Sequence, residues 1–256
     1  MRTLLIDIGN SRIKWAVLAS NGRLGRQRAC AHDGRPPRGW ERMLFEGAGA
    51  IERVVAVSVA PDSFERAIVR AATRRKIGRP HFVHAARSIG GVTTCYTEPW
   101  RLGADRLVAA IGAHALARSR TCCIVDVGTA MTLDILDGRG RHLGGAIVPG
   151  PRLMAEALLQ DTHGIKARAA GARVGARNFF ARNTRAAVQA GADYAVAATI
   201  DRAVLEAGKR LGLRPLVLLT GGAATAVAPL LRTRGIRKVP DLVLRGLAEL
   251  ASRHLR

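Results

Sequence analysis

Residues 4–11 (LLIDIGNS) and residues 123–130 (CIVDVGTA) carry the same pattern, nearly half the chain apart. In each stretch, three apolar residues lead to an aspartate, an apolar residue, a glycine and then small or polar residues. A second strand-like run and a turn signal follow in both places, and we expect one constant offset throughout. The repetition predicts two related α/β halves, each opening with a strand, a tight turn and a second strand.

The rest of the chain extends these halves, which we place at residues 1–118 and 119–256. Further strands are expected at residues 54–59, 81–83, 144–150 and 215–219. Helical spacing of apolar residues predicts helices at residues 62–72, 102–118, 151–159, 177–211 and 242–255. Residues 21–51 match no recognised pattern, and we expect them to be variable surface.

The charge of the chain raises the question of a nucleic-acid partner. The 256 residues carry a formal net charge of +22, and a basic surface attracts nucleic acid or acidic membranes. The arginines, however, are scattered, and the longest basic run is residues 74–76. We therefore expect a solvated basic surface that attracts a small anionic substrate, and we do not expect a nucleic-acid partner from the charge alone.

The cysteines and the amino terminus indicate a cytoplasmic protein. No CxxC pair occurs, and the adjacent Cys122 and Cys123 lie in an apolar run, which is typical of small buried residues. The first residues lead directly into a strand pattern, with no signal peptide or membrane-spanning segment. We expect no disulfide framework, no zinc site and no membrane association.

The paired Asp-x-Gly turns predict phosphate binding. Glycine lets the backbone approach a ligand closely and adopt positive φ, so the N–H groups of the turn can point at phosphate oxygens. The aspartate beside them can hold Mg²⁺ directly or through water. One Asp-x-Gly also fits an ordinary turn, but two at matching positions favour a pair of hairpins that hold the β- and γ-phosphates of ATP.

The chain resembles the acetate/sugar kinase–actin–Hsp70 superfamily. Residues 219–223 (LTGGA) are similar to its adenosine motif, although a simple strand-to-helix turn remains an alternative. The resemblance implies duplicated ribonuclease H-like (actin-like ATPase) domains with a cleft between them.

A more specific resemblance is to the type III pantothenate kinases. Residues 7–11 (DIGNS) and 126–130 (DVGTA) resemble their two phosphate motifs, with Ser11 in place of the usual Thr. Residues 102–106 (LGADR) resemble their Gly-x-Asp-Arg motif, and residues 144–150 (GGAIVPG) match their Gly-Gly-x-Ile-x-Pro-Gly stretch. The likeness runs in order from residue 4 to about residue 224.

This resemblance implies an ATP-dependent kinase that acts on pantothenate. It implies Asp105 as the general base, Arg106 for the substrate carboxylate, Asp7 for Mg²⁺ and Asp126 for a monovalent cation, K⁺ or NH₄⁺. Asp105 has a simpler alternative, because a helix N-terminus favours a carboxylate. The other nucleotide-binding residues expected are Gly9, Asn10, Ser11, Lys14, Gly128, Thr129, Gly221 and Gly222. The other pantothenate-binding residues expected are Tyr96, Gly103, Ala104 and Thr184.

The resemblance also implies a homodimer in which Thr184 reaches the substrate site of the other subunit. The Ala-rich run at residues 186–198 would allow a close helix contact, either with a partner or within its own chain. Two other functions stay open at this point: a related sugar kinase, and a nucleic-acid-binding or transcription accessory protein, which the charge motivates.

Overall fold

The computed structural model describes residues 1–37, 39–172 and 179–254. The chain forms two compact units that are not cut at one point of the sequence. Unit 1 contains Met1–Arg120, Leu136–Gly144 and Asp241–Arg256, and unit 2 contains Thr121–Ile135 and Gly145–Pro240. A division into domains at residues 118 and 119 stays a prediction.

A five-stranded sheet with the order β3-β2-β1-β4-β5 forms the centre of unit 1. Its strands are β1 (Thr3–Ile8), β2 (Arg12–Leu18), β3 (Arg28–Ala31), β4 (Arg53–Ser58) and β5 (His81–Phe82). The first three strands pair antiparallel, and β4 and β5 continue in parallel. The short strands β6 (Ser88–Ile89) and β7 (Val92–Thr93) form a separate ribbon.

Among its described residues, unit 1 has five helical segments, and four of them pack against this sheet. The four are α1 (Trp40–Phe45), α2 (Ser63–Arg74), α3 (Ala104–Ala117) and α8 (Leu242–Arg253), and the fifth is the short η1 (Pro99–Arg101). Leu4, Ile6 and Ile8 of β1 share a buried cluster with α1 and α2. Successive side chains of a strand point to opposite faces, so Asp7 lies on the other face of the sheet. The helices α3 and α8 contact the sheet strands but contribute nothing to the α1–α2 cluster.

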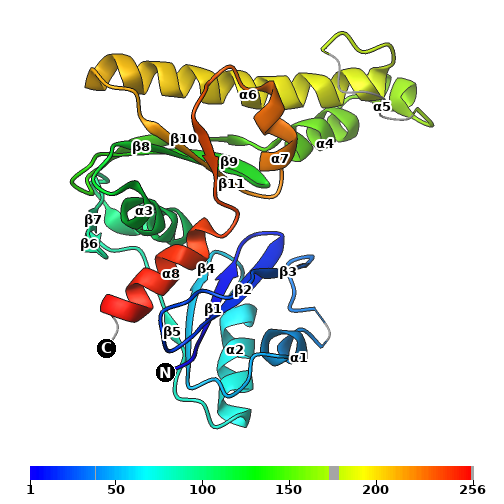
Figure 1. Ribbon diagram of the computed structural model, residues 1–256. Coiled ribbons are helices and arrows are strands. Elements are labelled where there is room, and N and C mark those ends of the chain that lie inside the picture. Colours follow the sequence, from blue (N-terminus) through cyan, green and yellow to red (C-terminus); the bar gives the residue numbers. More distant parts are fainter. Residues whose placement is uncertain (38, 173–178, 255–256) are drawn as a thin grey trace. The chain divides into compact units, whose positions relative to one another are not determined.

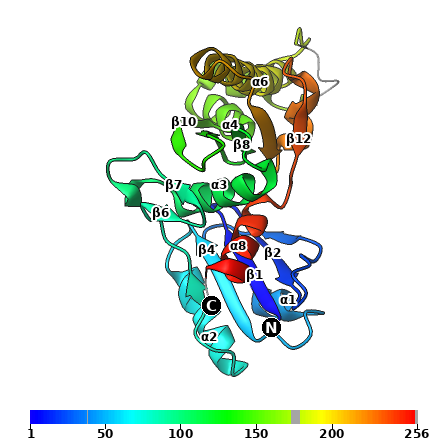
Figure 2. The ribbon, with the colours of Figure 1, turned by 60° about the vertical axis from the view of Figure 1, so that its left-hand side comes forward.

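The pair α3 and α8 is held close by two glycines. The helices lie side by side (Figure 1 and Figure 2). A Cβ at Gly112 would lie 2.4 Å from the Leu242 carbonyl oxygen, and a Cβ at Gly246 would lie 1.9 Å from that of Val108. The C-terminal helix therefore fixes the place of α3 in unit 1.

The second sheet repeats the first, with the order β10-β9-β8-β11-β12. Its strands are β8 (Cys122–Val127), β9 (Ala130–Leu136), β10 (His142–Pro149), β11 (Leu216–Thr220) and β12 (Ile236–Lys238). The helices of unit 2 are α4 (Pro151–Asp161), α5 (His163–Ala169), α6 (Thr184–Leu211), α7 (Ala224–Val227) and η2 (Ala228–Leu230). One face of β8 packs against α6 and α7 in a single apolar cluster.

The repeat extends to single hydrogen bonds. The residue after β4 donates to the end of β1 (Val59 N to Ile8 O, 3.0 Å), and the segment after β11 donates to the end of β8 (Ala223 N to Val127 O, 2.9 Å). The expected duplication of one α/β arrangement is confirmed, because both sheets have the same strand order. Within the described residues, the helices are too short or too polar to traverse a lipid bilayer.

The structure differs from the sequence-based expectation at residues 21–51 and at the start of the long helix α6. Residues 21–51 are not merely surface, because they include β3 and α1, and Trp40 and Leu44 are buried in the core. The helix expected from residue 177 begins at Thr184 in the described part, and residues 177–178 lie outside the described residues. Residue 255 of the last expected helix also lies outside them.

Candidate active site

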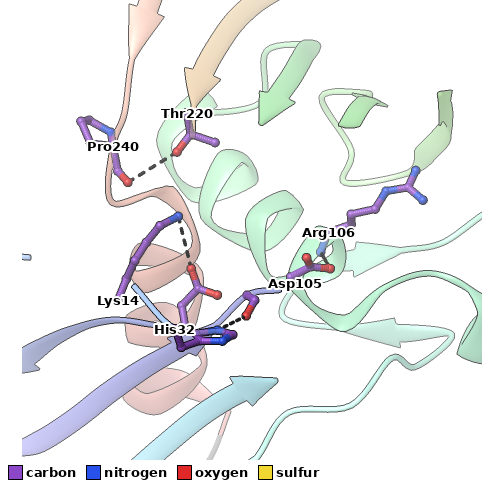
Figure 3. Close-up of polar contacts among 8 residues, drawn as sticks. Lys14, His32, Asp105, Arg106, Thr220 and Pro240 are labelled. Atoms are coloured by element: carbon purple, nitrogen blue, oxygen red, sulfur yellow. Dashed lines mark hydrogen bonds and ion pairs between the residues drawn. The ribbon is translucent and has the colours of Figure 1, made fainter. Parts of the chain in front are cut away.

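Asp7 and Lys14 face each other across the first hairpin. Asp7, near the end of β1, pairs in register with Lys14 of β2, and Lys14 Nζ lies 3.5 Å from Asp7 Oδ2. The Asp7 side chain is 6% exposed and that of Lys14 is 19% exposed. A carboxylate and an ammonium group therefore stand together where β1 ends (Figure 3).

The turn between these strands is tight, but its glycine does not adopt positive φ. Gly9 N donates to Arg12 O at 3.0 Å. Neither Gly9 nor Gly128 has a positive φ, so left-handed backbone is not what requires glycine at these positions. A Cβ at Gly9 would meet only Arg12 O, at 3.5 Å. Because Gly9 has no side chain, the backbone next to the exposed Asn10 is left uncovered.

Gly103 and Asp105 form the start of α3. Gly103 is the N-cap, and Asp105 stands in the first turn, where its Oδ1 accepts a hydrogen bond from Arg106 N at 2.8 Å (Figure 3). A Cβ at position 103 would lie 2.6 Å from that Oδ1. A side chain at position 103 would therefore displace the Asp105 carboxylate from this orientation.

Arg106 is buried and contacts Tyr96. Its residue is 7% exposed, its Nη1 donates to the Tyr96 hydroxyl oxygen at 3.1 Å, and its guanidinium carbon lies 5.7 Å from the centre of the tyrosine ring. Arg87 binds the backbone of Tyr96 and Thr97. Its Nη1 donates to the Tyr96 carbonyl oxygen at 2.6 Å, and its Nη2 donates to that of Thr97 at 2.8 Å.

The second turn, in unit 2, is built by close backbone contacts. Gly128 N donates to Ala130 O at 3.0 Å. Gly150 N, directly after β10, donates to Thr129 O at 2.8 Å, and a Cβ at Gly150 would lie 2.1 Å from Gly128 O. A Cβ at Gly145 would lie 2.0 Å from Leu133 O. The glycines at positions 145 and 150 of the GGAIVPG stretch are therefore needed for packing.

The two turns differ by one residue. The bond that closes the first turn spans Gly9 to Arg12, whereas that of the second spans Gly128 to Ala130. The constant offset expected between the repeats is therefore wrong beyond the glycines. Ser11 takes the place of Thr129, so a hydroxyl residue ends both turns, and Asn10 is the additional residue of the first turn.

The Thr-Gly-Gly segment at the end of β11 contains two glycines with different surroundings. Gly221 has φ +97°, and a Cβ there would lie 2.4 Å from Asp126 Oδ1. A Cβ at Gly222 would meet nothing within 4 Å. Thr220 is buried, and its hydroxyl donates to Pro240 O at 3.4 Å (Figure 3). Gly221 allows the backbone to pass close to the Asp126 carboxylate, whereas the space beside the Gly222 backbone is empty.

Thr184 is the first residue of α6. The Asn183 side chain caps this helix by accepting a hydrogen bond from Ala186 N at 2.9 Å. Thr184 is half-buried. The cap fixes where the helix begins and thereby places the threonine at its amino end.

The structure thus gathers the predicted residues into two groups. Unit 1 contains the first turn with Asp7 and Lys14, and the start of α3 with Tyr96. Unit 2 contains the second turn with Asp126, the Gly221–Gly222 backbone, and Thr184. Sequence reasoning gave no role to Arg87, which binds the Tyr96–Thr97 backbone, or to His32, which contacts the first turn. It quoted the GGAIVPG stretch but gave Gly150 no role.

Comparison with known proteins identifies the family. The family model described as type III pantothenate kinase matches residues 3–206. A type III pantothenate kinase of Nitrosococcus oceani is 36% identical, over 97% of this chain and 93% of the relative.

Solved structures share the fold. A putative Baf family transcriptional activator of Campylobacter jejuni has a TM-score of 0.59 and 17% identity, with 99% of this chain and 100% of that one covered. The activator of 2-hydroxyisocaproyl-CoA dehydratase of Clostridium difficile, solved with bound ADPNP, has a TM-score of 0.52 and 15% identity, with 97% and 92% covered. At these identities the likeness concerns the fold alone. On the family match and the curated relative, the chain belongs to the type III pantothenate kinase family.

Proposed function

We propose that this protein transfers the γ-phosphoryl group of ATP to the primary hydroxyl of pantothenate, in the cytoplasm. The product would be 4′-phosphopantothenate, in the first step of coenzyme A biosynthesis. The observation that carries the proposal is the start of α3, where Asp105 stands one residue before a buried Arg106 that contacts Tyr96, in a chain of this family. Phosphoryl transfer depends on positioning and charge stabilisation more than on covalent chemistry.

Asp105 is the general base of this proposal. It would accept the proton of the pantothenate hydroxyl as that oxygen attacks the γ-phosphorus, and the bond from phosphorus to the β–γ bridging oxygen breaks. The hydrogen bond from Arg106 N to Oδ1 fixes the carboxylate at the end of the helix. The collision that a side chain at position 103 would cause explains why this orientation needs Gly103.

Arg106 binds the carboxylate of pantothenate, with Tyr96, Gly103, Ala104 and Thr184 as further contacts. A guanidinium group suits a carboxylate because its donors match the two oxygens. Tyr96 orients Arg106, and the two hydrogen bonds from Arg87 keep the tyrosine segment in place. A buried cation of this kind favours a substrate that carries a negative charge.

The two turns bind the phosphates of ATP. The first turn would contribute Gly9, Asn10, Ser11 and Lys14, the second would contribute Gly128 and Thr129, and the backbone at Gly221 and Gly222 would meet the adenosine. Among the described residues, no three His, Cys, Asp or Glu side chains form a metal site. Asp7 therefore fits Mg²⁺ only as one ligand to an ion that takes its other oxygens from the nucleotide and water.

Asp126 would hold a monovalent cation, K⁺ or NH₄⁺. It lies near the end of β8 in the place that Asp7 has in β1. The phosphates of ATP carry more charge than one Mg²⁺ offsets, so a second cation at this position would stabilise the bound nucleotide. Rates measured in potassium and in sodium-only buffers should therefore differ.

The active unit is a homodimer. Next to the amino end of α6, Phe179 is 56% exposed and Phe180 is 87% exposed, and the Phe179 ring contacts Tyr194 of α6 at 4.8 Å. Exposed aromatic clusters of this kind are typical of subunit contacts. They lie a few residues from Thr184, so a partner that covers them would also meet that threonine.

A substrate panel tests the function. The protein should transfer phosphoryl from ATP to pantothenate in the presence of Mg²⁺ and K⁺, and not to common hexoses. Asp105→Asn should lower kcat by roughly 10²–10⁴ while the protein stays folded. A variant that turns over pantothenate at the wild-type rate would show that Asp105 is not the base.

Mixed subunits test the shared site. If Thr184 acts across the interface, mixing Asp105→Asn with Thr184→Val subunits creates dimers with one doubly altered site and one intact site. Activity should then rise above that of either parent after subunit exchange. A monomer by light scattering, or no recovery despite proven exchange, would rule this arrangement out.

A further inference from the structure

His32 contacts the first turn through both its backbone and its side chain. It directly follows β3, and its N–H donates to Ser11 O at 3.0 Å. Its ring Nε2 lies 2.8 Å from the carbonyl oxygen of Gly9 (Figure 3). Two carbonyl groups of the first turn, those of Gly9 and Ser11, thus accept hydrogen bonds from one residue.

The neighbouring backbone determines which ring nitrogen carries the proton. Gly34 N donates to His32 Nδ1 at 3.1 Å, so Nδ1 is the acceptor. In the neutral ring the other nitrogen is then the donor, and Nε2–H donates to Gly9 O. The ring also packs against Phe64, with 4.6 Å between ring centres. Its orientation is therefore fixed from two sides.

The bond to Gly9 sets the direction of the next amide. In a trans peptide the C=O and N–H groups point in opposite directions, so a Gly9 carbonyl that faces His32 turns the Asn10 N–H away from it. Asn10 is exposed. In the described part of the chain, no hydrogen bond occupies its N–H. The His32 ring therefore lies on one side of the Gly9–Asn10 peptide, and the Asn10 N–H points to the other side.

We propose that His32 is a positioning residue for the nucleotide: it holds the Gly9 carbonyl so that the Asn10 N–H points at a phosphate oxygen. This inference rests on the proposed function, in which the first turn binds the phosphates of ATP. His32 itself does not touch the phosphate, because its ring is bonded to the carbonyl on the opposite side of the same peptide. Its effect therefore falls on nucleotide binding and not on pantothenate.

Three substitutions separate the two hydrogen bonds of the ring. His32→Gln keeps a donor near the Nε2 position, His32→Asn keeps only an acceptor near the Nδ1 position, and His32→Phe keeps only the ring against Phe64. One net hydrogen bond corresponds to roughly a tenfold change in an equilibrium. We expect the KM for ATP to rise about tenfold in the Asn and Phe variants and to stay within about twofold in the Gln variant.

The KM for pantothenate and the melting temperature serve as internal references. If His32 only stabilised the fold, its loss would change these quantities as well as the KM for ATP. His81→Asn is the matched control, since His81 is exposed in β5 of the same unit. An unchanged KM for ATP in the Asn and Phe variants, with an active wild type, would overturn the inference alone. So would a Gln variant that is folded yet as impaired as the Phe variant.

A readout that needs no activity completes the test. The ¹⁵N shifts of the His32 ring in the wild-type protein should report the Nε2–H tautomer, and the Asn10 amide should shift when a non-hydrolysable ATP analogue is added. An Nδ1–H ring would overturn the inference even if the variants fail to fold. A wild-type protein that binds no ATP analogue would overturn the proposed function, and this inference with it.

Discussion

The first turn, residues 9–11, and the second turn, residues 128–129, follow the first strand of two sheets that share one strand order. In both, the residue after the third strand donates its N–H to the turn: His32 N to Ser11 O, and Gly150 N to Thr129 O. This hydrogen bond is therefore matched in the two repeats, although the first turn is one residue longer.

The contacts that fix the two turns differ. In the first repeat an imidazole ring donates to the carbonyl oxygen of Gly9. In the second repeat the equivalent residue is Gly150, and the carbonyl oxygen of Gly128 lies 2.1 Å from where its Cβ would be. The first turn is therefore fixed by a side-chain hydrogen bond, and the second turn by direct packing of backbone against backbone.

The strands after the turns differ in the same way. Lys14 forms an ion pair with Asp7, whereas Thr132 takes its place once the shorter second turn is allowed for. A duplicated fold can thus keep one backbone and stabilise each copy by different physical means. The first copy should be sensitive to loss of polar groups and the second to added volume.

The largest effect is expected from added volume at the second turn. In Gly150→Ala the new Cβ would meet two backbone oxygens, at 2.1 and 2.7 Å, and neither can move aside as a flexible side chain could. We expect a loss of about 3 kcal/mol in the free energy of unfolding, the upper end of the usual cost of overpacking, measured by denaturant titration. Gly222→Ala is the control, because its Cβ meets nothing within 4 Å. Equal stabilities for the two variants would contradict the backbone-contact account.

An intermediate effect is expected when the first hairpin is given the residue of the second. Lys14→Thr removes the charge that faces the nearly buried Asp7 carboxylate. The unfolding free energy should fall by about 1–3 kcal/mol, the usual cost of removing one partner of a buried polar group. Arg66→Thr, which breaks an exposed pair with Asp62, should cost less than about 1 kcal/mol. If both variants lose the same amount, the Lys14–Asp7 pair has no special weight.

The smallest effect is a loss of unfolding free energy at alkaline pH, and it is expected from a residue of the second repeat that has no titrating counterpart in the first. Burial raises the pKa of the Cys122 thiol from 9.0 to about 12, whereas its counterpart in β1 is Thr3, which does not titrate. Below pH 9 the thiol is protonated in both the folded and the unfolded chain. Between pH 9 and pH 12 only the unfolded chain releases the proton, so stability falls as pH rises.

At pH 10 this loss amounts to about 1 kcal/mol. Cys122→Ala should therefore lose less unfolding free energy than the wild type between pH 8 and pH 10. Cys95→Ala is the matched control, because Cys95 is exposed. A Cys122→Ala variant that loses as much stability as the Cys95→Ala variant would show that the buried thiol does not contribute.

Sequence reasoning found the strands and helices that carry long apolar runs, and with them the duplication. It missed β3 because that strand has four residues with no alternation, and its pairing with β2 comes from tertiary contact. It missed α1 because six residues are too few to show a helical period.

At the site, the motifs located Asp105 and Arg106 at the start of a helix, as expected. They could not reveal which glycines serve packing, because this depends on atoms far away in sequence, as for Gly150. They also could not reveal His32, which lies in a segment with no motif. A signal existed in principle: His32 follows the third strand of its repeat, as Gly150 does.

The central proposal is that the first and second turns each contribute to binding the phosphates of ATP. The direct measurement is a titration of the ¹⁵N-labelled protein with Mg²⁺ and a non-hydrolysable ATP analogue, followed by the backbone amide shifts of Asn10 and Thr129. The account predicts that both amides shift and saturate with a single Kd. If only one of them responds, or if the two saturate with different Kd values, the two turns do not bind one nucleotide and the account is contradicted.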